Sequence, residues 1–126
     1  MTFPTADQVA IAIVTASRET GADPLAVASG VKDTSVGGRW LVSRARSYAA
    51  VALHEAFPDV KPKMIGRMAG ARSNPDTFMV NLDHSLRNGR FSWWSEEVAE
   101  RVMAALEAAM PIETPAFLPD EATTAI

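Results

Sequence analysis

The residues of this chain best suited to chemistry are basic and small polar side chains in its central part. Between Lys32 and Arg90 there are ten basic and five acidic residues, although the whole chain has a net charge of −3. Local charge decides whether a phosphate backbone is attracted, so this central excess indicates an anionic partner such as nucleic acid. The alternative is that these basic side chains are scattered over a solvated surface.

Catalysis and metal binding have less support in the sequence. The chain has no cysteine, which excludes disulfides, thiolate zinc sites and cysteine nucleophiles. His54 precedes Glu55 and Asp83 precedes His84, but adjacent residues on a helix point about 100° apart and do not share a proton. Two histidines without further ligands do not make a zinc site. We therefore expect no enzymatic activity and no cofactor or bound metal.

Capping residues and prolines divide the chain into helices. Thr5 and Gln8 form an expected capping box, and prolines at 24, 62 and 75 each begin a helix, where their missing N–H costs nothing. Apolar residues recur at helical spacing, and no strand-like alternation is present. The expected fold is an all-α, compact bundle of five or six helices. Its segments lie at Thr5–Gly21, Asp23–Gly30, Trp40–Phe57, Pro62–Gly70, Asn74–Asn88 and from Ser92 or Ser95 to Pro111.

The expected domain covers residues 1–111, and residues 112–126 are interpreted as a flexible acidic tail because they lack periodicity. No apolar run approaches the roughly 18 residues of a membrane span. The N-terminus also lacks the basic and apolar regions of a signal peptide. We therefore expect a cytoplasmic protein with no membrane partner and, if it binds DNA, a nucleoid-associated one.

The fourth and fifth helices, joined by a short turn with glycine, have the pattern of a helix-turn-helix. In that motif the first helix braces against the DNA backbone and the second enters the major groove. Free N–H groups at the start of the fifth helix can hold a phosphate, and short polar side chains there can reach base edges. The residues expected to do so are Ser73, Asn74, Asp76 and Thr77.

Basic residues surround this motif on two sides. A loop ahead of the third helix can enter the neighbouring minor groove, where arginine senses groove width and potential. Its basic residues, with those just inside the helix, are Lys32, Arg39, Arg44 and Arg46. The fourth helix and the turn carry cations suited to phosphates on either side of the major groove. These are Lys61, Lys63, Arg67 and Arg72.

Ser43 to Arg46, the alanine-rich helix through Leu53, and KMIGRMAGARSNPDTFMVNL at 63–82 resemble the C-terminal DNA-binding domain of the bacterial replication initiator DnaA. The resemblance covers about residues 5 to 110 and implies a Trp-repressor-like helix-turn-helix. It further implies a minor-groove role for Arg39 or Arg44 and phosphate contacts from Arg46 and Lys63. The base contacts that it implies come from Arg72, Asn74, Asp76 and Thr77.

The chain departs from DnaA in two respects. After the turn Gly70-Ala71-Arg72 it has Ser-Asn-Pro-Asp-Thr, where DnaA typically has aspartate, histidine and two threonines, so a different base sequence is expected. It also has no GxxxxGK[ST] nucleotide-binding loop, which argues against replication initiation. The chain is similar to the stand-alone DnaA-like activators of gene transfer agents in alphaproteobacteria. This implies an activator of a phage-like or gene-transfer-agent gene cluster, acting with RNA polymerase or a DNA-bending protein.

Another class of function stays open, namely a helical protein–protein adaptor without DNA binding. Trp93 and Trp94 with the acidic flanks would form its docking face. Adjacent tryptophans at a helix start usually divide, one into the core and one onto a rim or partner surface. Arg87 and Arg90 fit either a phosphate contact or a favourable position at a helix C-terminus.

Overall fold

A computed structural model describes the backbone of residues 3–30 and 38–110 and the side chains of residues 3–30 and 40–110. The described residues form six α-helices and contain no β-strand, which confirms the expected all-α bundle. The expected tail, 112–126, lies outside the described residues. The helices are α1 (Ala6–Thr20), α2 (Pro24–Ser29), α3 (Gly38–Ala56), α4 (Pro62–Met68), α5 (Pro75–Arg87) and α6 (Glu96–Ala108).

The ends of these helices follow local sequence signals closely. The expected capping box is present: the N–H of Thr5 donates to Gln8 Oε1 over 2.7 Å, and the N–H of Gln8 donates to Thr5 Oγ1 over 3.1 Å. Asp23 caps α2 by accepting from the N–H of Leu25. Of the two serines considered for α6, Ser95 is the cap, since its hydroxyl accepts from the N–H of Val98.

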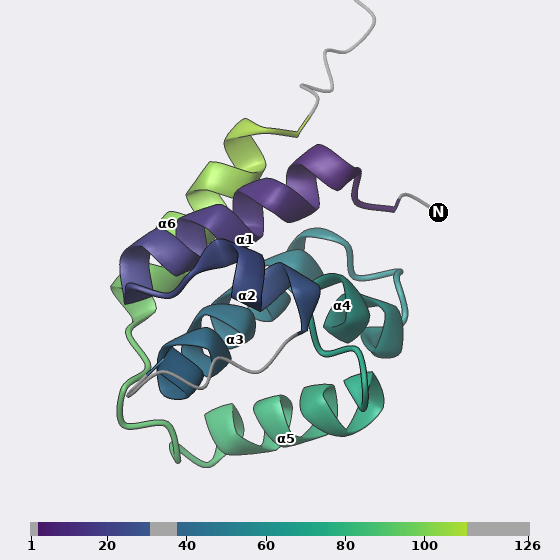
Figure 1. Ribbon diagram of the computed structural model, residues 1–126. Coiled ribbons are helices and arrows are strands. Elements are labelled where there is room, and N and C mark those ends of the chain that lie inside the picture. Colours follow the sequence, from purple (N-terminus) through teal and green to yellow (C-terminus); the bar gives the residue numbers. More distant parts are fainter. Residues whose placement is uncertain (1–2, 31–37, 111–126) are drawn as a thin grey trace, which may run out of the picture.

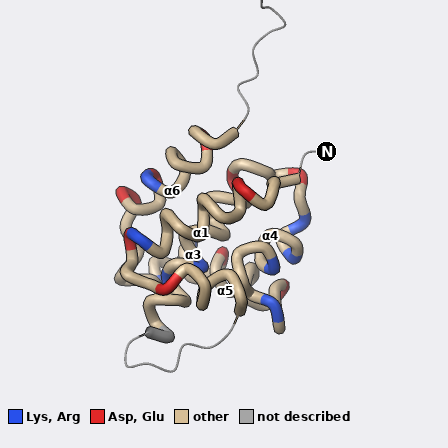
Figure 2. The backbone as a smooth tube through the Cα atoms, turned by 45° about the horizontal axis from the view of Figure 1, so that its top comes forward, with Lys and Arg blue, Asp and Glu red and all other residues tan. Residues whose placement is uncertain are grey.

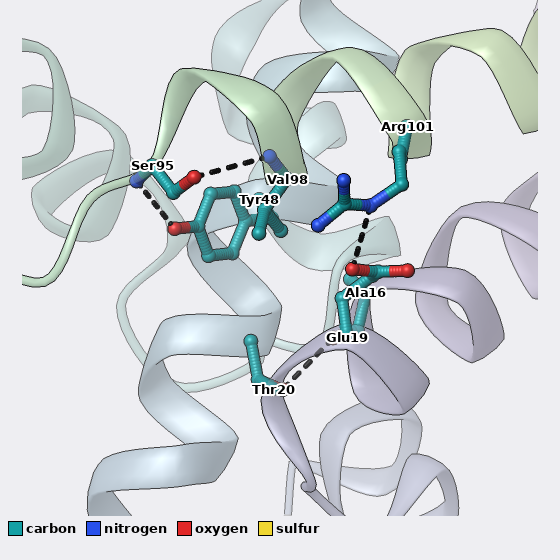
Figure 3. Close-up of polar contacts among 7 residues, drawn as sticks. All are labelled: Ala16, Glu19, Thr20, Tyr48, Ser95, Val98 and Arg101. Atoms are coloured by element: carbon teal, nitrogen blue, oxygen red, sulfur yellow. Dashed lines mark hydrogen bonds and ion pairs between the residues drawn. The ribbon is translucent and has the colours of Figure 1, made fainter.

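Three long helices, α1, α3 and α6, pack against one another to form the core (Figure 1). Their facing positions are rich in alanine, including Ala16 and Ala49, which are fully buried. Small side chains let helix axes approach closely, and Leu53 and Leu106 fill the remaining space. An ion pair of 2.8 Å between Arg101 Nε and Glu19 Oε1 links α6 to α1 at the surface (Figure 3).

Tyr48 joins the connection between α5 and α6 to the middle of α3. Its hydroxyl accepts from the N–H of Ser95 over 2.8 Å and donates to the carbonyl of Trp93 over 3.3 Å (Figure 3 shows the Ser95 bond). Its ring stacks on Trp94 at 4.3 Å between centroids and meets Trp93 edge-on at 5.6 Å. Both indoles are half-buried, so the expected division into one core and one rim tryptophan is wrong. The Tyr48 ring packs against both indole rings.

Replacing Tyr48 with phenylalanine should lower the free energy of unfolding by about 1–2 kcal/mol, because the Ser95 N–H and the Trp93 carbonyl lose a partner while the ring packing stays. Urea denaturation measures the difference. Ser92→Ala, an exposed position in the same connection, serves as the control and should change stability by less than about 0.5 kcal/mol. A Tyr48→Phe variant as stable as the parent would show that the hydroxyl does not anchor this segment.

Helix α5 packs mainly on α4, at the end of the molecule opposite α1 and α6 (Figure 1). Gly66 makes this pairing close: a Cβ there would lie 2.9 Å from the Pro75 carbonyl oxygen and 3.0 Å from Met79 Cγ. The buried residues of α5 are Pro75, Met79 and Leu82, whereas Phe78 and Leu86 are half-buried. The two helices therefore form a tight unit that leaves most of α5 facing solvent. None of the described helices is both long and apolar enough to cross a membrane.

Candidate nucleic-acid interface

The α4–α5 unit gathers seven of the residues predicted to contact DNA. The basic side chains of Lys63 and Arg67 on α4, and of Lys61 directly before it, are exposed, and Figure 2 shows several blue segments at this helix. The polar residues of the turn and of the first turn of α5 are exposed as well. These are Ser73, Asn74, Asp76 and Thr77. The helix pair thus presents cations and short hydrogen-bonding side chains together.

The start of α5 has available donors. Pro75 at the first helical position has no N–H, and the Asn74 side chain makes no capping hydrogen bond to the N–H groups that follow. Uncapped N–H groups at a helix N-terminus favour an oxygen anion such as phosphate. Asp76 opposes this with its own negative charge, but its carboxylate is a suitable acceptor for a cytosine amino group.

Further exposed residues of α5 were missed by the sequence reasoning. Val80, Asn81 and His84 follow Thr77 at spacings of three, four and seven, so they continue the same solvent face along the helix. Val80 keeps 66% of its surface exposed, which is unusual for a valine in a helix. The sequence carries a signal for these residues, because they lie at helical spacing from Thr77 and on the side of the helix away from Met79 and Leu82.

Arg46 has a different position from the phosphate contact that the resemblance implied. Its Nη2 donates to the carbonyl oxygens of Ala26 and Val27, over 3.4 Å and 3.1 Å, at the C-terminal end of α2. The side chain is half-buried, and this burial lowers the pKa of its guanidinium by desolvation. Its Nε is buried without a hydrogen-bond partner. Arg46 therefore fixes α2 to α3 and faces inward.

Arg72 makes a related contact from the turn between α4 and α5. Its Nε and Nη2 donate to the carbonyl oxygen of Ala28, over 3.4 Å and 3.1 Å. Two arginines thus satisfy successive carbonyls at the C-terminal end of α2, where the helix dipole favours positive charge. Arg72 is still exposed to solvent. Its guanidinium nevertheless holds the turn against α2.

Gly70 brings the turn into direct contact with α2. Its φ is +109°, and a Cβ there would lie 1.8 Å from the Val27 carbonyl oxygen and 2.9 Å from Arg46 Nε. Gly30, the αL residue that ends α2, faces the same turn, since its Cβ would lie 2.9 Å from the Gly70 carbonyl oxygen. We call this contact of Gly30, Gly70, Arg46 and Arg72 with the end of α2 the α2 junction. It sets the position of α4 and α5 relative to the core.

Among the described residues, Arg44 lies away from the α4–α5 surface. Arg44 is half-buried, and its guanidinium carbon lies 5.5 Å from the centroid of the Trp93 ring, a cation–π contact. Its Nε is buried without a hydrogen-bond partner. Lys32 and the Arg39 side chain lie outside the described residues. At the other end of α5, Arg87 forms an ion pair with Asp83 one turn earlier.

Comparisons of the chain with protein-family models, with curated proteins and with solved structures found no match. The likeness to the DNA-binding domain of DnaA therefore stays a prediction from the residues quoted above. What supports a function is the chemistry of the α4–α5 unit, namely exposed cations next to an uncapped helix start.

Proposed function

We propose that the protein binds double-stranded DNA with the α4–α5 unit and regulates transcription, as an activator. The observation that carries the proposal is the shared location of Lys61, Lys63 and Arg67 with the exposed polar start of α5. Cations supply the sequence-independent attraction to phosphates, and polar side chains of an inserted helix supply the preference for a base sequence.

In this proposal α5 lies in the major groove and α4 crosses the backbone. The N–H groups at the start of α5 face a phosphate, while Ser73, Asn74, Asp76 and Thr77 contact base edges. Farther along the helix, the amide of Asn81 suits adenine and the exposed methyl groups of Val80 suit the methyl group of thymine.

Arginines 46 and 72 have a positioning role in the proposal. Both hold the end of α2, so they set the angle at which α5 leaves the core and keep the turn from moving. The implied minor-groove contact then falls to the basic loop, whose Lys32 and Arg39 side chains are not described. RNA polymerase or a DNA-bending protein is the proposed partner at the promoter, because a single helix-turn-helix buries little DNA surface by itself.

The test is selection of bound fragments from random genomic DNA by the purified protein, followed by affinity measurements at two salt concentrations. We expect the recovered fragments to share a motif and the affinity to fall steeply as salt rises. Absence of binding at low salt would refute the proposal. Binding without an enriched motif would restrict the function to sequence-independent DNA association.

Replacing Asn81 with alanine should relax one position of the recovered motif and weaken binding at the preferred site by about 1–3 kcal/mol. Asn81 is exposed on α5, so thermal stability should stay unchanged. Lys63→Ala provides the contrast, because losing a phosphate contact weakens all sequences alike. An Asn81→Ala variant with an unchanged motif would place the base-reading surface elsewhere on the protein.

A further inference from the structure

Two hollows run along α3 on the side that faces α5 and α6. The first, of about 780 Å³, lies between α3, α4 and α5, and the second, of about 310 Å³, lies between α3, α5 and α6. Both are lined by Val51, Glu55 and Leu86, so they adjoin at these residues. We call the two together the α3 groove. It is long enough to extend from the start of α4 to the middle of α6.

The floor of the α3 groove is apolar. Val51, Leu86 and Met103 are half-buried in it, and Met79 is almost completely buried. Val80 lies at the edge with most of its surface exposed. Removing apolar surface of this kind from water lowers the free energy, so the groove favours a partner that covers it.

The rim of the groove is mainly acidic. Its exposed carboxylates are Glu55, Asp76, Asp83, Glu96 and Glu100, and they outnumber the two lysines, Lys61 and Lys63, at the α4 end. Among the described residues, Asp83 is paired with Arg87, whereas neither Glu55 nor Glu100 has an ion-pair partner. These carboxylates would repel a phosphate backbone. The groove meets the proposed DNA surface at its α4 end, where Lys61, Lys63, Asp76 and Val80 line both.

We propose that the α3 groove binds an amphipathic helix of a partner protein that carries lysines and arginines beside its apolar face. Apolar residues at spacings of three, four and seven would contact Val51, Leu86 and Met103, as in other helix-in-groove interactions. The flanking basic residues would pair with Glu55 and Glu100, which fixes the orientation of the helix and favours basic over acidic partners.

Helix α5 presents largely different residues to the two proposed interactions, and the two share Asp76 and Val80. Met79, Asp83 and Leu86 face the groove, while Thr77, Asn81 and His84 lie roughly opposite them around the helix. The groove proposal therefore does not rest on DNA binding.

Charge also argues against two other occupants. Residues 111–126 contain acids at Glu113, Asp120 and Glu121 and no basic residue, so the rim would repel this segment. A second copy of the chain, with a net charge of −3, would bring its own acidic rim toward the first. Neither complements the groove as a basic helix does.

The test uses the full chain and a synthetic amphipathic peptide of about 18 residues, five helical turns, with leucines on one face and lysines and arginines on the other. Fluorescence anisotropy measures its affinity. We expect Glu55→Lys/Glu100→Lys to weaken binding roughly tenfold. Glu97→Lys/Glu107→Lys makes the same change in net charge at exposed positions outside the groove and should alter affinity less than about twofold. Methyl resonances of Val51 and Leu86 should shift on binding.

Several results would overturn the proposal. One is equal weakening by both double variants, which would mean attraction by total charge alone. Another is equal binding of a peptide whose basic residues are replaced by glutamate, or binding without a shift at Val51 and Leu86. Tighter peptide binding after deletion of residues 111–126 would assign the groove to that segment. Self-association weakened by Glu55→Lys would assign it to a second copy, and methyl shifts caused by DNA alone would assign it to nucleic acid.

Discussion

Replacing Gly70 with alanine should lower the free energy of unfolding by about 3 kcal/mol or more. This is the largest effect that we expect from adding a methyl group at any of the described glycines. Two costs combine at this position. The backbone is in a conformation with φ of +109° that L side chains rarely adopt, and the new Cβ would lie 1.8 Å from the Val27 carbonyl oxygen. Since that oxygen belongs to backbone, either the turn or the end of α2 has to move.

Gly89→Ala separates the two costs. Gly89 also has a positive φ, of +62°, but no atom lies within 4 Å of its would-be Cβ. This variant should lose only about 1 kcal/mol, the cost of the backbone conformation. Urea denaturation of both variants gives the contribution of the α2 junction as their difference. Equal losses of stability in the two variants would mean that α2 and the turn move apart at little cost in free energy. The junction would then not position α5.

Replacing Lys63 and Arg67 together with glutamine should weaken DNA binding roughly a hundredfold near 0.1 M salt. Both side chains are exposed on α4, so stability should hardly change. The loss follows from counterion release: each phosphate contact contributes about 0.9 to the slope of log affinity against log salt. The slope should therefore become less steep by nearly 2, as measured by titrations at several salt concentrations.

Arg18→Gln/Arg101→Gln serves as the charge-matched control. Both residues are exposed on α1 and α6, away from the α4–α5 unit, and replacing them removes as many positive charges as the first double variant does. Arg101→Gln also breaks the surface ion pair with Glu19, which contributes at most about 1 kcal/mol to stability. We expect binding within about threefold of the parent and an unchanged slope, because exposed charges beyond a Debye length are largely screened. Equal losses from the two double variants would show that DNA responds to total charge and that α4 is not the contact surface.

The helices of this protein could be predicted well from its sequence, because their ends depend on neighbours a few residues apart. The box between Thr5 and Gln8, the cap at Asp23 and the prolines at positions 62 and 75 all act within one turn. The structure corrects three of the expected ends. Ser95 rather than Ser92 caps α6, α5 ends at Arg87, one residue before the expected Asn88, and α3 begins at Gly38, two residues before the expected Trp40.

The roles of the arginines could not be predicted from the sequence. Arg46 and Arg72 are 19 and 44 residues from the α2 carbonyls that they bind, and a basic residue on a helix has no local feature that distinguishes a phosphate contact from an inward contact. From the distribution of charge along the sequence, both were predicted to be cations on the surface. In the structure both are used within the protein. Within the described part of the chain, Lys61, Lys63 and Arg67 are the basic candidates beside the turn that form no ion pair.

The sequence by itself determined that the chain is helical, where most of its helices begin and end to within one or two residues, and that its basic residues are concentrated in the centre. These properties depend on residue type and short spacing. The tertiary structure alone decided which side chains are available. Arg46 and Arg72 have partners because Gly70 packs against the end of α2. The α3 groove and its acidic rim exist because α3, α4, α5 and α6 pack together. Contacts between distant segments depend on how the helices pack, and the residue pattern of one helix does not specify which other helices pack against it.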